Sequence, residues 1–162
     1  MSAIAKAPWQ VAFAACTAIV VGVSYAVSAL LDIANAGDRG AIDERLAEYQ
    51  ALAGLGSASV SEVHEWMALA ATVFAVVSAV FLLLGILLWQ GALRPGVRLT
   101  LTITSLIAFA GTLAPLAEGL NQVSAVREET LIFLMVVHAV SVVGALLLWS
   151  PSVKRWITEP VD

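Results

Sequence analysis

The most prominent pattern in the chain is the alternation of four long apolar runs with polar segments. The runs cover residues 9–31, 67–89, 99–117 and 131–149, and none of them contains Asp, Glu, Lys or Arg. Each run is close to the roughly 20 residues that a helix, rising about 1.5 Å per residue, needs to cross the hydrocarbon core of a bilayer. A stretch such as VFAVVSAVFLLLGILLW is apolar on every face, whereas strands of a membrane barrel alternate polar and apolar residues. The pattern therefore predicts four transmembrane helices.

Composition supports this interpretation. Of the 162 residues, 60% are hydrophobic and 12% are charged, whereas a soluble domain carries about 25% charged residues. Small residues recur at every fourth position, as in Ala14, Ala18 and Gly22, and such ladders let helix backbones approach closely in lipid. We expect an all-α polytopic membrane protein: one domain, residues 1–162, folded as a four-transmembrane-helix bundle.

The outer loop, residues 32–66, also contains helical signals. Ile42, Leu46, Tyr49 and Ala53 recur at the spacing of one helical face, which predicts a short amphipathic helix. The Ser59-x-x-Glu62 pattern is typical of a capping box. We therefore expect the second span to begin outside the bilayer.

Lys and Arg in short loops tend to remain in the cytoplasm. One group of basic residues is expected on one side of the membrane: Lys6, Arg94, Arg98, Lys154 and Arg155. A smaller group is expected on the other: Arg39, Arg45 and Arg127. This asymmetry predicts a multi-pass protein of the cell membrane with both termini cytoplasmic.

The end of the first run resembles a signal-peptidase site, because Ala34-Asn35-Ala36 has the small-x-small form. However, the apolar stretch is longer than the roughly 7 to 15 residues of a usual signal core, and Lys6 is the only basic residue before it. We expect the first span to be retained.

Charge and cysteine content argue against several functions. The formal net charge is −4, and no cluster of basic residues is present, so nucleic acid is not an expected partner. The single cysteine, Cys16, excludes an intramolecular disulfide. No Ser-His-Asp set or glycine-rich phosphate loop is recognisable. We expect no enzymatic activity, no cofactor and no resident metal.

His138 is the one readily ionisable group deep inside a span, and such groups tend to face a partner or a cavity. Matching residue depths across the four runs places Ser24, Tyr25, Thr72, Ser78 and Thr112 near it. A hydroxyl partner for a neutral imidazole, a proton or solute path, and a cofactor ligand are all open interpretations. A b-type haem is not expected, because it needs two axial ligands at one depth.

A second candidate site lies at the outer rim, where Glu62, His64, Glu65 and Glu118 can converge. Imidazole and carboxylate groups bind zinc or manganese. The alternative is a solvated helix end, since the adjacent His64 and Glu65 are about 100° apart on a helix.

Two segments in the second half of the chain, SLIAFAGTLAPL and LIFLMVVHAV, resemble the closing pair of spans in small uncharacterised actinobacterial four-helix integral membrane proteins. The resemblance covers about half of the chain and involves Pro115, Leu116, Met135 and His138. The long acidic first loop departs from the compact loop of that family. The resemblance implies an architecture and no mechanism.

The spans contain packing ladders but lack the buried charges that most pumps use. We therefore expect a non-enzymatic accessory or scaffold subunit, whose partners are the lipid bilayer and other membrane subunits or a second copy of itself. One alternative is a small oligomeric transporter or channel for a proton, ion or small solute, using His138. Another is a membrane sensor that binds a ligand through its acidic outer loop.

Overall fold

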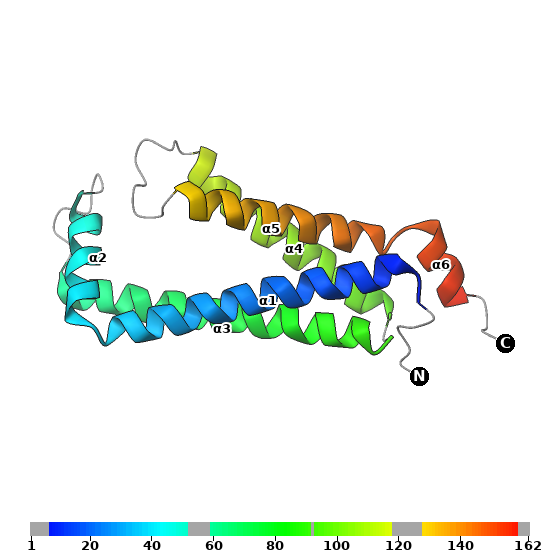
Figure 1. Cartoon of the computed structure of the whole chain (residues 1–162), viewed down its shortest axis with the longest axis horizontal. Helices are drawn as coiled ribbons and strands as arrows, with labels where there is room; N and C mark the ends of the chain where they lie inside the picture. Colours follow the sequence, from blue (N-terminus) through cyan, green and yellow to red (C-terminus); the bar gives the residue numbers. More distant parts are fainter. Residues whose placement is uncertain (1–6, 52–58, 92, 118–127, 159–162) are drawn as a thin grey trace.

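The computed structural model describes residues 7–51, 59–91, 93–117 and 128–158 (Figure 1). These residues form six helices and no strand: α1 (Trp9–Ala36), α2 (Arg39–Ala51), α3 (Val60–Trp89), α4 (Pro95–Ala117), α5 (Glu128–Leu147) and α6 (Pro151–Thr158). The predicted all-α class is confirmed.

Three of these helices, α1, α3 and α4, are long and apolar enough to cross a membrane. The segment Ile132–Leu147 of α5 and helix α6 meet the same criteria only as a pair that is bent by 48°. Large apolar side chains cover the outside, with Val20 54%, Leu83 58% and Ile107 66% exposed. A surface this apolar requires lipid or protein around it. The chain thus has three or four candidate spans, while the closed four-helix bundle stays a prediction.

The most extensive packing is between α1 and α3, and it depends on glycines. A Cβ added to Gly22 would lie 2.7 Å from Leu82 Cγ, and one added to Gly85 would lie 2.7 Å from Ile19 Cγ1. Both distances are shorter than real carbon contacts allow, so a side chain at either position would push the helices apart. The small-residue ladder of α1 thus places two backbones in close contact.

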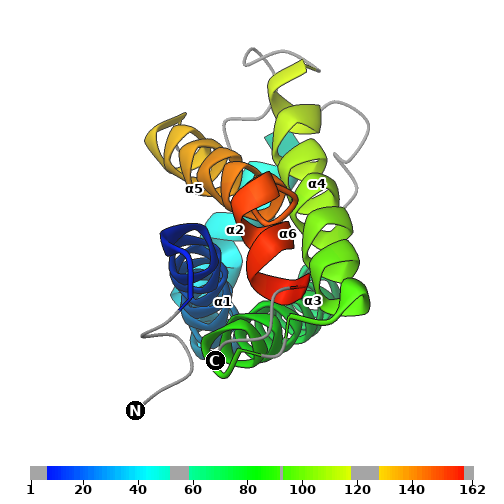
Figure 2. The ribbon, with the colours of Figure 1, turned by 90° about the vertical axis from the view of Figure 1, so that its right-hand side faces the viewer.

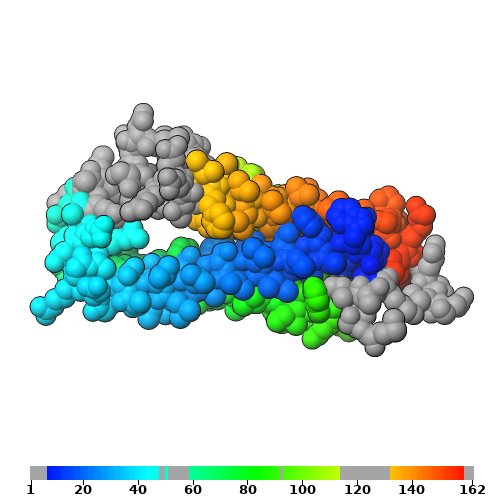
Figure 3. All heavy atoms as spheres, in the orientation of Figure 1, coloured from blue at the N-terminus to red at the C-terminus, as the bar shows by residue number. Residues whose placement is uncertain are grey.

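Helix α5 packs against both α4 and α1, and it thereby connects α4 to the α1–α3 pair. Gly144 of α5 lies against Thr17 of α1, where an added Cβ would be 2.7 Å from Thr17 Oγ1. Figures 1 and 3 show α1 and α5 closer together toward α6 than toward α2. The buried cluster includes Phe81, Leu101 and Leu148, one from α3, one from α4 and one just after α5.

Helix α3 begins as the sequence predicts. The Ser59 backbone N–H donates to Glu62 Oε2 at 2.8 Å, and the Glu62 N–H donates to Ser59 Oγ at 3.4 Å. Both halves of the capping box are therefore present. Because the helix starts at Val60, it is one turn or more longer than its apolar run.

Helix α2 occupies part of the predicted outer loop. Ile42 and Leu46 are half-buried, and Arg45 attracts the carboxylate of Asp32 at the end of α1. The Tyr49 side chain and Ala53, the other members of the predicted apolar face, lie outside the described residues. The amphipathic character of the helix stays a prediction.

The opposite end of the molecule carries α6, which lies across the ends of the long helices (Figure 2). Gln10 Nε2 donates to Ser152 Oγ at 2.9 Å and so joins α1 to α6. We call this the basic end, defined by the side chains of Arg94, Arg98, Lys154 and Arg155. Arg39 and Arg45 belong to α2 at the other end, while Lys6 and Arg127 lie outside the described residues. The distribution agrees with the grouping predicted from the loops.

Candidate functional site

The structure brings His138 and Tyr25 together. The Tyr25 Oη atom and His138 Nε2 are 2.9 Å apart, which joins the middle of α1 to α5. His138 is 1% exposed. Tyr25 is one of the five residues that depth matching places near His138, and it lies 113 positions away in sequence.

Aromatic rings surround this pair. The Tyr25 ring centroid lies 5.6 Å from that of Phe74 and 6.5 Å from that of Phe81, with the Phe81 ring nearly parallel. The Tyr25 and His138 ring centroids are 5.5 Å apart. Three helices, α1, α3 and α5, therefore meet at Tyr25, and the phenol–imidazole hydrogen bond is shielded by apolar faces.

The roles of the two groups in this hydrogen bond depend on the tautomer of the imidazole. A neutral ring that accepts the tyrosine hydrogen at Nε2 carries its own hydrogen on Nδ1. His138 Nδ1 is buried and has no hydrogen bond of ordinary geometry to any described residue, although the Leu134 carbonyl one turn earlier interacts with the ring. The geometry suits a hydrogen bond that holds α1 and α5 together.

The other predicted neighbours form hydrogen bonds to groups other than His138. Ser24 Oγ donates to the Val20 carbonyl at 2.9 Å, and Thr112 Oγ1 donates to the Phe109 carbonyl at 2.7 Å. Each hydroxyl is therefore bonded within its own helix, as is usual for Ser and Thr in apolar surroundings. Of the predicted intramembrane set, the structure brings together only Tyr25 and His138.

Two further polar contacts were not anticipated. Ser105 Oγ and Ser141 Oγ lie 3.0 Å apart, buried between α4 and α5. Ser78 Oγ donates to the Gly22 carbonyl at 2.7 Å, from α3 to α1. Ser141 follows His138 by three residues, so the two lie on one face of α5, and that periodicity was the available signal.

At the outer rim, Glu62 is engaged by Ser59, whose hydroxyl donates to Glu62 Oε2 at 2.7 Å. His64 and Glu65 are exposed on the first turns of α3. Within the described ranges, no three His, Cys, Asp or Glu side chains converge closely enough to hold a metal ion. Glu118, the fourth predicted member, lies outside those ranges, so the complete rim site stays a prediction.

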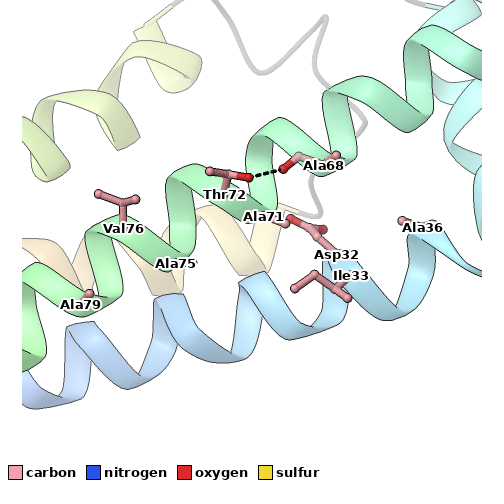
Figure 4. Close-up of a pocket in the computed structure, with 9 residues that line it drawn as sticks. All are labelled: Asp32, Ile33, Ala36, Ala68, Ala71, Thr72, Ala75, Val76 and Ala79. Atoms are coloured by element: carbon pink, nitrogen blue, oxygen red, sulfur yellow. Dashed lines mark hydrogen bonds between the residues drawn. The ribbon is translucent and has the colours of Figure 1, made fainter.

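A groove of about 650 Å³ lies on the surface between α1 and α3 (Figure 4). We call it the alanine groove, and its lining residues are Asp32, Ile33, Ala36, Ala68, Ala71, Thr72, Ala75, Val76 and Ala79. Thr72 Oγ1 donates to the Ala68 carbonyl at 2.8 Å, so its hydroxyl is already bonded. The remaining polar group is the half-buried Asp32 carboxylate.

The fold and these contacts describe an all-helical chain with several helices suited to cross a membrane. No protein family, curated protein or solved structure was found to match it.

Proposed function

We propose that this chain is a non-enzymatic accessory or scaffold subunit of a cell-membrane complex, and that it binds a transmembrane helix of another subunit in the alanine groove. The observation that carries the proposal is the groove itself. It is a long shallow surface of small side chains on two of the candidate spans. Close approach of backbones over small residues is a main source of helix association in lipid.

The chemistry of the groove indicates what its partner carries. Asp32 is the one acidic side chain in the lining, and a carboxylate beside lipid favours a partner with a basic or hydroxyl group. Arg45 of α2 attracts the same carboxylate. We therefore expect a helix with small residues on one face and a Lys, Arg, Ser or Thr level with Asp32.

The interior favours packing over transport. Three inter-helix contacts pair buried polar groups with one another: Tyr25 with His138, Ser78 with the Gly22 carbonyl, and Ser105 with Ser141. Groups that are mutually bonded stabilise one arrangement of helices. A solute path would instead present such groups to water or to the solute.

Native purification tests the proposal. We expect the wild-type chain, gently extracted and weighed by native mass spectrometry, to appear in a defined complex with a second membrane protein. Ala75→Phe fills the groove and should release that partner, whereas Val73→Phe, at an exposed α3 position outside the groove, should retain it. A wild-type monomer or homo-oligomer, or a partner retained by a folded Ala75→Phe chain, would overturn the proposal.

The second candidate function, proton or small-solute transport, is favoured by one observation, the burial of His138 Nδ1, which makes no hydrogen bond of ordinary geometry within the described residues. This candidate predicts that proteoliposomes containing the wild-type chain transport protons or a small solute, and that His138→Phe abolishes this transport. Equal flux in wild type and His138→Phe, with the fold preserved, would remove this candidate.

A further inference from the structure

The basic end contains a second hollow, of about 490 Å³, between the α3–α4 turn and α6. It is lined by Gly91, Leu93, Arg94, Pro95, Trp156 and Ile157. Gly91 adopts a positive φ of 79°, a conformation that suits glycine. The turn it makes brings Arg94 to the same hollow as Trp156 of α6.

Unpaired hydrogen-bond donors occur here. Trp156 Nε1 and Arg98 Nε are buried and have no hydrogen-bond partner within the described ranges. The Arg98 guanidinium also lies over the Trp149 ring, 4.3 Å from its centroid. Because a buried donor without an acceptor costs free energy, an anionic ligand that accepts such hydrogen bonds would be favoured.

The charge at this end is of one sign within the described residues. Arg94, Lys154 and Arg155 are exposed. The acidic residues whose side chains are described belong to the last turns of α1, the region of α2 and the first turns of α3, at the opposite end. Clustered cations beside a membrane attract anionic lipid headgroups, and guanidinium groups bind phosphate well.

Apolar side chains at the basic end indicate which chemical class of anion the hollow would bind. Leu99, Trp149 and Ile157 are exposed apolar side chains at the same end, at 52%, 49% and 42%. A ligand that satisfies both the cations and this apolar surface carries a phosphate and hydrocarbon chains in one molecule. Trp and Arg near the ends of spans typically lie at headgroup level.

We propose that the hollow between the α3–α4 turn and α6 binds the phosphate headgroup of an anionic phospholipid, with Arg94 and the Trp156 N–H as its donors. The acyl chains extend along the apolar sides of α4 and α5. This site is separate from the alanine groove and does not depend on a protein partner.

The test uses the full chain in micelles that contain equal amounts of phosphatidylglycerol and phosphatidylcholine, with native mass spectrometry to count retained lipids. We expect preferential retention of phosphatidylglycerol. Arg94→Gln should lower this preference about fivefold, the effect of one basic residue at an anionic surface. Trp156→Phe, which keeps the ring and removes the N–H, should also lower it.

Arg39→Gln is the matched control, because it removes the same charge from the opposite end and should leave the preference unchanged. Equal retention of both lipids by wild type, an unchanged preference in Trp156→Phe, or an equal loss in Arg39→Gln would overturn the proposal. Displacement of phosphatidylglycerol by excess inorganic phosphate would also overturn it, because the site would then be one for free phosphate. An unchanged thermal transition verifies that the variants fold, which matters most for Trp156→Phe because Trp156 Nε1 is buried.

Discussion

The Tyr25 hydroxyl lies 2.9 Å from His138 Nε2, and this single contact joins two helices whose paired residues are 113 positions apart in the chain. Tyr25 also stacks on Phe81 of α3. The pair therefore links α1, α3 and α5 in the middle of the fold.

Tyr25→Phe should lower the free energy of unfolding by about 1 kcal/mol, because it removes the hydroxyl and leaves the buried imidazole without its partner at Nε2. Unfolding of the purified protein in mixed micelles measures this. A double-mutant cycle with His138→Phe should give a coupling of about 0.6 kcal/mol and at most about 1.7 kcal/mol, the average and the maximum for hydrogen bonds between membrane helices. Additive single effects would contradict a direct bond.

Gly85→Ala should destabilise the protein by about 1 to 3 kcal/mol, the usual range for overpacking, since the new Cβ would lie 3.2 Å from the Ala15 carbonyl oxygen and 2.7 Å from Ile19 Cγ1. Gly111→Ala is the control, because nothing lies within 4 Å of its added Cβ. The control should be neutral or slightly stabilising. Thermal denaturation in detergent compares the two, and equal effects would show that α1 and α3 are not in close contact at Gly85.

Ser59→Ala should weaken the start of α3 by about 1 kcal/mol, the usual contribution of an N-cap residue. Hydrogen exchange at the amides of residues 60–63 should accelerate, while exchange in the middle of α3 stays the same. Ser61→Ala retains both halves of the box and should behave as wild type. Unchanged exchange in Ser59→Ala would mean that the box does not stabilise this end.

Cysteine labelling tests the proposed orientation, with Cys16→Ser as the background. Glu44→Cys on α2 should react with a membrane-impermeant maleimide in intact cells, because α2 is expected outside. Lys154→Cys on α6 should react only after the membrane is permeabilised. Both positions are exposed, so the reverse pattern would place both termini outside.

The sequence predicts the helical class well, because only helices and closed barrels satisfy the backbone hydrogen bonds in lipid, and runs that are apolar on every face do not fit the alternating strands of a barrel. The capping box at Ser59 and Glu62 is local and was predicted from spacing alone. The Tyr25–His138 contact is not local, and matching the depths of polar residues limits the partner to five candidates without choosing among them.

Other features depend on which helices pack together, and the apolar runs of the sequence do not specify this. The Ser105–Ser141 contact requires α4 to face α5 at a particular rotation, and many serine pairs fit the spacing equally well. Helix α5 ends at Leu147, before the apolar run ends, and α6 begins at Pro151. Proline at the first helical position and the restriction it places on the preceding residue explain this break, but the run itself continues through Trp149 and conceals it.

Helix α3 has 30 residues, which corresponds to about 45 Å at about 1.5 Å per residue, whereas the hydrocarbon layer is about 30 Å thick. The capped start of α3 therefore stands above the hydrocarbon layer when the basic end lies at the opposite headgroups. The alanine groove then crosses the lipid boundary, with Asp32 on its water side. Membrane thickness would thus control how much of the groove is submerged, and the same chain would present a deeper docking surface in a thicker bilayer.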